Sequence, residues 1–80
     1  MNDVKRLKNE KEFDEWVETT DYGRIYSFEI AGKQGWKAKY LKEVDAEETT
    51  IKFWQEIYDE KNILKEIHIK YPVDRGHQKL

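Results

Sequence analysis

The last third of the chain concentrates residue types that can move protons and stabilise a phosphate. Glu66, His68, Arg75 and His77 fall within twelve consecutive positions. A histidine exchanges a proton near neutral pH, and an arginine can stabilise the charge that builds on a phosphate during RNA cleavage. These four residues are therefore candidates for the acid–base site of a small toxin-like ribonuclease. Because 40% of the chain is charged, they are more typical of a solvated surface, and we assign no catalytic residue from sequence alone.

A metal site is the second chemistry that these residues suggest. His68, Asp74 and His77 would converge if the C-terminal tail folded back on the preceding strand. Their spacing matches no compact zinc motif, and the chain has no cysteine. Gly32 and Gly35 flank a predicted turn and do not open a helix, so they do not form a phosphate-binding loop. We predict neither a metal nor an organic cofactor.

Aromatic residues interleaved with lysines form a candidate binding surface. Its members are Lys52, Trp54, Tyr58, Leu64, His68 and Lys70. Such a surface could stack on the bases of single-stranded RNA while its lysines meet the phosphates. It is also suited to packing against the N-terminal helix or a partner protein, because large aromatic side chains bury much apolar area. A separate basic edge comprises Lys33, Lys37, Lys39 and Lys42; such lysines are typical of residues that keep a sheet soluble.

A hairpin in the second half of the chain would position these residues. Residues 49–59 are rich in β-branched and aromatic side chains, which favours a strand, although residues 45–48 could instead cap a helix there. Residues 63–71 alternate as a second strand. The turn at 59–62 can hold a bulge with Asn62 in the left-handed conformation.

The bulged register divides the hairpin into two faces. One face would hold Ile51, Phe53, Ile57, Ile67, Ile69 and Tyr71. On the other face, Trp54 would lie opposite His68 and Tyr58 opposite Leu64. This register also opposes Glu56 to Glu66 and Lys52 to Lys70, which is mildly destabilising because like charges repel.

The first half of the chain predicts a short helix and another hairpin. Asn9 followed by Glu12 resembles a capping box, which predicts a helix over about residues 10–19 that ends before Gly23. The side chains that would share one face of this helix are Phe13, Trp16 and Val17. The apolar period then changes to two. The predicted cross-strand pairs are Tyr26 with Tyr40, Phe28 with Ala38, and Ile30 with Trp36.

These elements predict an α+β fold of one short N-terminal helix packed on a four-stranded antiparallel β-meander, in the order α-β-β-β-β. Eighty residues suit a single domain over residues 1–80. We expect residues 1–8 and 73–80 to be loosely ordered and the C-terminal tail to be flexible. The pattern leaves open which face of the sheet the helix covers.

Composition limits the function classes. The absence of cysteine fits a reducing compartment, and no apolar run approaches the length of a membrane span or a signal peptide, so we expect a cytoplasmic protein. The 15 basic and 17 acidic residues are interspersed, which is untypical of a DNA-binding protein. Our leading hypothesis is a non-enzymatic protein-interaction module, with self-association as its simplest form. The alternative is an RNA-binding protein, or a ribonuclease that uses His68, Arg75 and His77.

Overall fold

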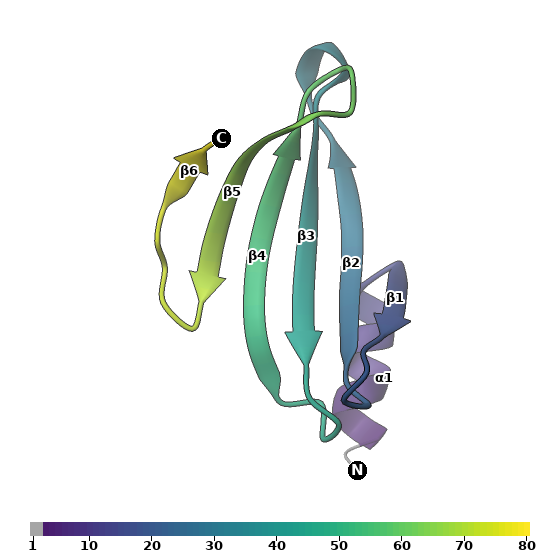
Figure 1. The fold of residues 1–80 in the computed structure, drawn as a ribbon. Coiled ribbons are helices and arrows are strands. Elements are labelled where there is room, and N and C mark those ends of the chain that lie inside the picture. Colours follow the sequence, from purple (N-terminus) through teal and green to yellow (C-terminus); the bar gives the residue numbers. More distant parts are fainter. Residues whose placement is uncertain (1–2) are drawn as a thin grey trace.

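The computed structural model describes residues 3–80, which form one α-helix and a six-stranded antiparallel sheet (Figure 1). The sheet is a meander in which each strand pairs with the next along the chain. The elements are α1 (Asp3–Glu12), β1 (Glu15–Glu18), β2 (Arg24–Ala31), the short 3₁₀ turn η1 (Lys33–Gly35), β3 (Lys37–Val44), β4 (Thr50–Tyr58), β5 (Leu64–Tyr71) and β6 (His77–Lys79). The predicted α+β class is confirmed, but the sheet has six strands instead of the predicted four.

The helix begins and ends earlier than predicted. α1 covers Asp3–Glu12, and residues 15–18, which the sequence predicts as helix, form β1 instead. The pattern misleads because Phe13 and Trp16 reach the core from outside a helix, with ring centroids 5.7 and 5.8 Å from that of Tyr26. Residues 3–8, predicted to be loosely ordered, are helical, whereas residues 1–2 lie outside the described residues.

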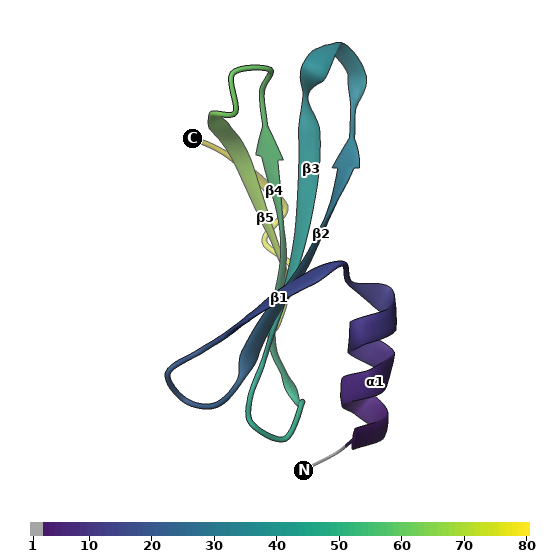
Figure 2. The same ribbon diagram turned by 90° about the vertical axis from the view of Figure 1, so that its right-hand side faces the viewer.

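Polar side chains attach α1 to the sheet. Val4 and Leu7 are exposed, whereas Asn9 is buried. The Asn9 side-chain amide donates to Oε2 of Glu48 at 3.2 Å, and the guanidinium of Arg6 donates to Oε1 of Glu48 at 2.8 Å. Figure 2 shows that α1 lies on one side of the sheet only. We call this side the helix face and the opposite side the open face.

The core is small and lies where α1 meets the sheet. In the part of the chain that the structure describes, its buried hydrophobic side chains are Phe13, Tyr26 and Val44, and a further buried side chain, Leu41, lies on the open face. Phe28 and Phe53 pack against this core and are themselves only partly buried. Towards β4, β5 and β6 the sheet is a single layer whose side chains are half-buried or exposed.

The four loops between β1 and β5 share one backbone feature. Each contains a residue in the left-handed conformation two positions before the next strand: Tyr22 (φ 66°), Gly35 (φ 82°), Glu48 (φ 65°) and Asn62 (φ 64°). The prediction for Asn62 is therefore confirmed. Such residues allow tight turns whose twist matches that of the strands.

The hairpin of β2 and β3 forms where predicted, but its register differs by two residues. Phe28 pairs with Tyr40 and Ile30 with Ala38, because the turn is centred on Gln34 within η1. A shift of two residues keeps every side chain on its predicted face. Tyr26, Phe28 and Tyr40 therefore share the helix face, where the Phe28 and Tyr40 rings stack with centroids 5.1 Å apart.

The hairpin of β4 and β5 confirms a strand at residues 49–59 and the predicted pair of Tyr58 with Leu64. A bulge then shifts the register next to Tyr58, and a second one shifts it between Phe53 and Trp54. As a result Trp54 lies opposite Ile69, not His68. The shift also sets Glu56 opposite Ile67, which removes the opposition of Glu56 and Glu66 that the simpler register imposed.

The C-terminal segment forms strand β6 instead of the flexible tail that the sequence suggests. His77 pairs with His68 across the strands, and the Leu80 backbone N–H donates to the Lys65 carbonyl at 2.9 Å. Backbone pairing thus extends the sheet with residues that carry no apolar side chains in β6. Among residues 3–80, no helix is both long and apolar enough to cross a membrane.

Candidate functional site

The two histidines meet on the helix face at the β6 edge of the sheet. Strand pairing places Gln55, His68 and His77 side by side across β4, β5 and β6. The two imidazole rings lie 4.5 Å apart between centroids, at an angle of 53°. Three of the four predicted acid–base residues therefore come together here, because Glu66 also lies within 3.5 Å of His77 Nδ1.

His68 holds the loop between β5 and β6. Its Nε2 lies 2.6 Å from Oδ1 of Asp74, and the same oxygen accepts the Gly76 backbone N–H at 2.8 Å. These bonds, first that of Gly76 and then that of His68, hold the pKa of Asp74 below its usual range. The other ring nitrogen of His68, Nδ1, is buried without a hydrogen-bond partner. Because neither nitrogen is free to meet a substrate, this geometry suits a positioning role better than proton transfer.

His77 presents its ring to solvent, with its side chain half exposed. Arg75, the fourth candidate, does not join the histidines. It lines a pocket with Lys52 and Ile69 on the open face. The structure thus separates the predicted phosphate-binding residue from the predicted proton-transfer residues.

The described residues contain no group of three or more His, Cys, Asp or Glu side chains arranged to hold a metal ion. Asp74 approaches His68, as the metal hypothesis requires, but it does so as a hydrogen-bond partner of the ring and of the Gly76 backbone.

The predicted aromatic and lysine surface divides between the two faces. Lys70 lies on the helix face with its ammonium 5.2 Å from the centroid of the Tyr40 ring, and His68 is on that face as well. On the open face are Lys52, Trp54, Tyr58 and Leu64. The bulge next to Tyr58 causes this division, since a one-residue shift moves a side chain to the other face.

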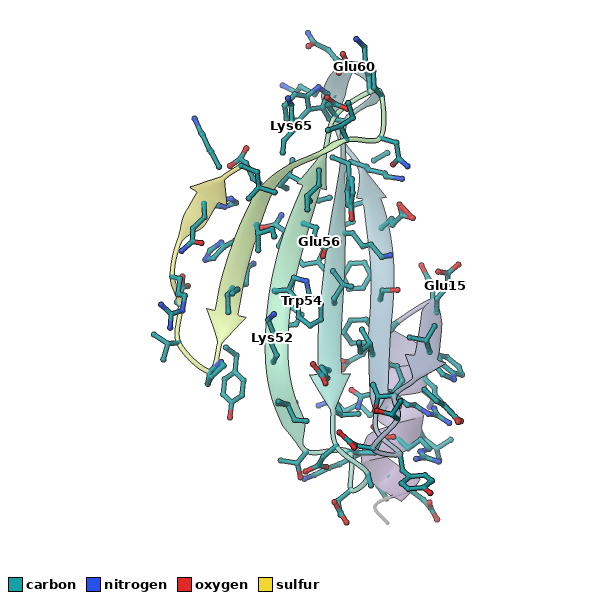
Figure 3. All side chains as sticks on the ribbon, in the orientation of Figure 1. Glu15, Lys52, Trp54, Glu56, Glu60 and Lys65 are labelled. Atoms are coloured by element: carbon teal, nitrogen blue, oxygen red, sulfur yellow. The ribbon has the colours of Figure 1, made fainter. Side chains whose placement is uncertain are left out.

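The open face carries an apolar row across three strands. Strand pairing aligns Leu41, Trp54 and Ile69, and the first of these is buried while the other two are half-buried. Figure 3 views this face, with Lys52, Trp54 and Glu56 following one another along β4. The sequence predicts Ile69 on the other face. The like-charge pairs of the predicted register, Glu56 with Glu66 and Lys52 with Lys70, are the signal that argues against it.

A carboxylate joins the polar ends of the aromatic residues on this face. Glu56 accepts hydrogen bonds from Trp54 Nε1 at 3.0 Å and from the Tyr58 hydroxyl at 2.6 Å. Burial, together with this bonding to an anion, raises the pKa of Tyr58 to about 12. The Lys52 ammonium lies 4.5 Å from the centroid of the Trp54 ring. Trp54 and Tyr58 are therefore held in place by Glu56 before any partner is present.

The predicted basic edge is not a continuous cationic patch. Lys37 forms an ion pair with Glu29 at 3.1 Å and lies 5.5 Å from the centroid of the Tyr58 ring on the open face. Lys42 lies on the helix face, where it donates to Oδ1 of Asn9 at 2.8 Å.

Comparison with known proteins adds no relative: no family model matches the chain, and no curated protein or solved structure is significantly similar to it.

Proposed function

We propose that this chain is a non-enzymatic module that binds another protein through the open face of its sheet. The single observation that supports this best is the contrast between a small core and a wide one-layer sheet. Domains normally bury a sheet face against a second layer, and exposed apolar patches on small proteins are typical of interaction sites. A partner on the open face supplies that missing layer.

The residues of the open face suit a protein interface. Trp and Tyr side chains dominate binding energy in many interfaces, and here Trp54 and Tyr58 have their polar atoms already bonded to Glu56. Covering these rings therefore leaves neither the indole N–H nor the phenol O–H without a partner.

Charge on the open face favours a protein over a nucleic acid. Lys39 lies opposite both Glu29 and Glu56 in the strand pairing, and Lys52 lies opposite Glu43. Alternating charges of this kind provide no basic stripe for a phosphate backbone. We place the interaction in the cytoplasm, because a chain without cysteine needs no oxidising compartment.

The simplest partner is a second copy of the chain, and sedimentation velocity over a concentration series tests it. We expect a concentration-dependent dimer for the wild type, a monomer for Trp54→Glu, and an unchanged dimer for Ile63→Glu. Ile63 is the matched control because it is 52% exposed and lies at the end of a hairpin loop, outside the apolar row.

A monomeric wild type would exclude the homodimer and move the test to other proteins. A photo-reactive side chain at position 64 on the open face and one at position 4 on the helix would then be compared in cells. Adducts to a protein at position 64 that disappear in Trp54→Glu support the proposal. Equal adducts at both positions, or none at position 64, contradict it.

RNA cleavage is the second candidate function, and the meeting of His68, His77 and Glu66 favours it. In this version the exposed ring of His77 exchanges the proton and His68 positions the loop beside it. Loss of RNA cleavage in His77→Gln, in a protein that still folds, would support it. Intact RNA in the presence of wild-type protein would remove it.

A further inference from the structure

The open face ends in a pocket that the apolar row does not fill. Its volume is about 350 Å³, and its apolar walls are Ile51, Ile69, Pro72 and Val73. Ile69 belongs to both the pocket and the apolar row, so the two form one continuous surface. A pocket of this size with apolar walls is suited to one or two side chains of a partner.

The lining of this pocket carries a cation, Arg75, that has no ion-pair partner among the residues that the structure describes. Among residues 3–80, the Arg75 side chain has no ion pair, hydrogen bond or ring contact. Lys52 adds a second positive charge to the lining, and Glu43 supplies one negative charge. The lining therefore has two cations and one anion, a net charge of +1, which suits one carboxylate, since a polyanion such as a phosphate backbone needs a larger basic surface.

The loop that carries Arg75 is anchored on the opposite face of the sheet, the helix face. Asp74 is bound to His68 on the helix face, and its neighbours Val73 and Arg75 line the pocket on the open face. The Arg75 backbone N–H donates to the Ile69 carbonyl at 2.9 Å. The pocket is thus formed in the absence of a ligand, which lowers the ordering cost of binding.

We propose that this pocket receives a partner segment in which an apolar side chain is followed directly by a carboxylate. The apolar side chain lies against Ile51 and Ile69, and the carboxylate bonds Arg75, with Lys52 beside it. This inference rests on the proposed function, because it defines the chemistry of the protein that the open face binds.

An NMR titration of the ¹⁵N-labelled chain, at concentrations where sedimentation shows a monomer, tests the proposal. The probe is the capped peptide Gly-Gly-Leu-Glu-Glu-Gly-Gly, and its counterpart has lysine in place of both glutamates. We expect the acidic peptide to shift the backbone amides of residues 51–52, 69 and 73–76, and the basic peptide to leave them unchanged.

A charge-reversed double variant, Lys52→Glu with Arg75→Glu, provides the specificity control. Loss of charge-assisted hydrogen bonds should weaken the acidic peptide by roughly tenfold or more, and the basic peptide should now bind. Lys61→Glu makes the same kind of charge change in the 59–62 turn and should have no effect. His68→Ala should also weaken the peptide by freeing the loop that carries Arg75.

The outcomes separate this inference from the proposed function. Equal binding of both peptides, or no shift with either, overturns the pocket's assignment. The proposed function would still be supported in that case if the Trp54→Glu variant lost its dimer or its protein adducts. The converse result is also possible to recognise. If the chain binds only the acidic peptide, but Trp54→Glu does not change its binding to the partner, the pocket is supported and the role of the apolar row is contradicted.

Discussion

The hydroxyl of Tyr26 lies 2.9 and 3.0 Å from the two carboxylate oxygens of Glu48, and both residues are almost completely buried. This contact joins β2 to the loop between β3 and β4, and the same carboxylate binds α1 through Arg6 and Asn9. Glu48 also has a φ of 65°, which favours glycine or asparagine. A carboxylate in a strained backbone position thus replaces the apolar contact that usually fixes a helix on a sheet.

Removing the Tyr26 hydroxyl should therefore destabilise the fold. We expect Tyr26→Phe to lower the free energy of unfolding by about 1–3 kcal/mol, because it removes a hydrogen bond to a charged group in the core. Urea denaturation followed by tryptophan fluorescence measures this. Tyr22→Phe is the control, since Tyr22 is 84% exposed and its change should be near zero. Equal effects of the two variants would contradict the role assigned to the contact.

Glu48 should make the stability depend on pH in the acid range. Burial raises its pKa, but the hydrogen bonds from Arg6, Tyr26 and Asn9 outweigh burial and leave the pKa below the usual value. The contribution is then fully present above the pKa of an unfolded glutamate, about 4.3. It is lost as the pH falls through the lower folded pKa.

Glu48→Gln isolates this contribution. We expect the variant to be less stable than the wild type near neutral pH, with the difference shrinking as the solution is acidified. Asp59 and Asp74 also have lowered pKa values, but they are present in both proteins, so the difference reports Glu48. If the difference in stability stayed constant from neutral to acid pH, the charge of Glu48 would not be what stabilises the fold.

Much of the fold follows from the alternation of apolar residues, and the exceptions have physical causes. The strands around Asn62 are predictable because β-branched and aromatic residues alternate on both sides of a turn with one left-handed position. The position of α1 is not predictable in this way. Val4 and Leu7 face solvent and Asn9 is buried, which is the reverse of the pattern of an amphipathic helix.

The candidate site was only partly predictable for a related reason. Strand β6 has no apolar side chain, and its order depends on backbone pairing and on the Asp74 contact with His68. Neither contact leaves a pattern in the sequence. The sequence predicts the wrong face for His68 and Lys70, because a bulge adds one residue to a strand without changing its composition.

Position 23 should not tolerate any residue larger than glycine, because the backbone of β3 leaves no room for a Cβ atom there. A Cβ at this position would lie 2.1 Å from the Val44 carbonyl oxygen, whereas one at Gly32 would be 3.2 Å from its nearest neighbour. We expect Gly23→Ala to cost about 1–3 kcal/mol through the forced separation of β2 from β3, and Gly32→Ala to cost clearly less. Thermal unfolding of both variants decides this, and equal melting temperatures would contradict it.

The contact of His68 with Asp74 should control the order of the C-terminal strand. In His68→Ala, Asp74 loses its partner on β5 and keeps only the local Gly76 N–H, so residues 74–80 should exchange their amide hydrogens faster. His77→Ala is the matched control, because its contact with Glu66 is longer and half exposed and contributes little. Hydrogen exchange followed by NMR distinguishes the two variants, with β2 and β3 as the internal reference. If both variants left the Leu80 amide equally protected, backbone pairing alone would hold β6, and the Arg75 wall of the pocket would not depend on His68.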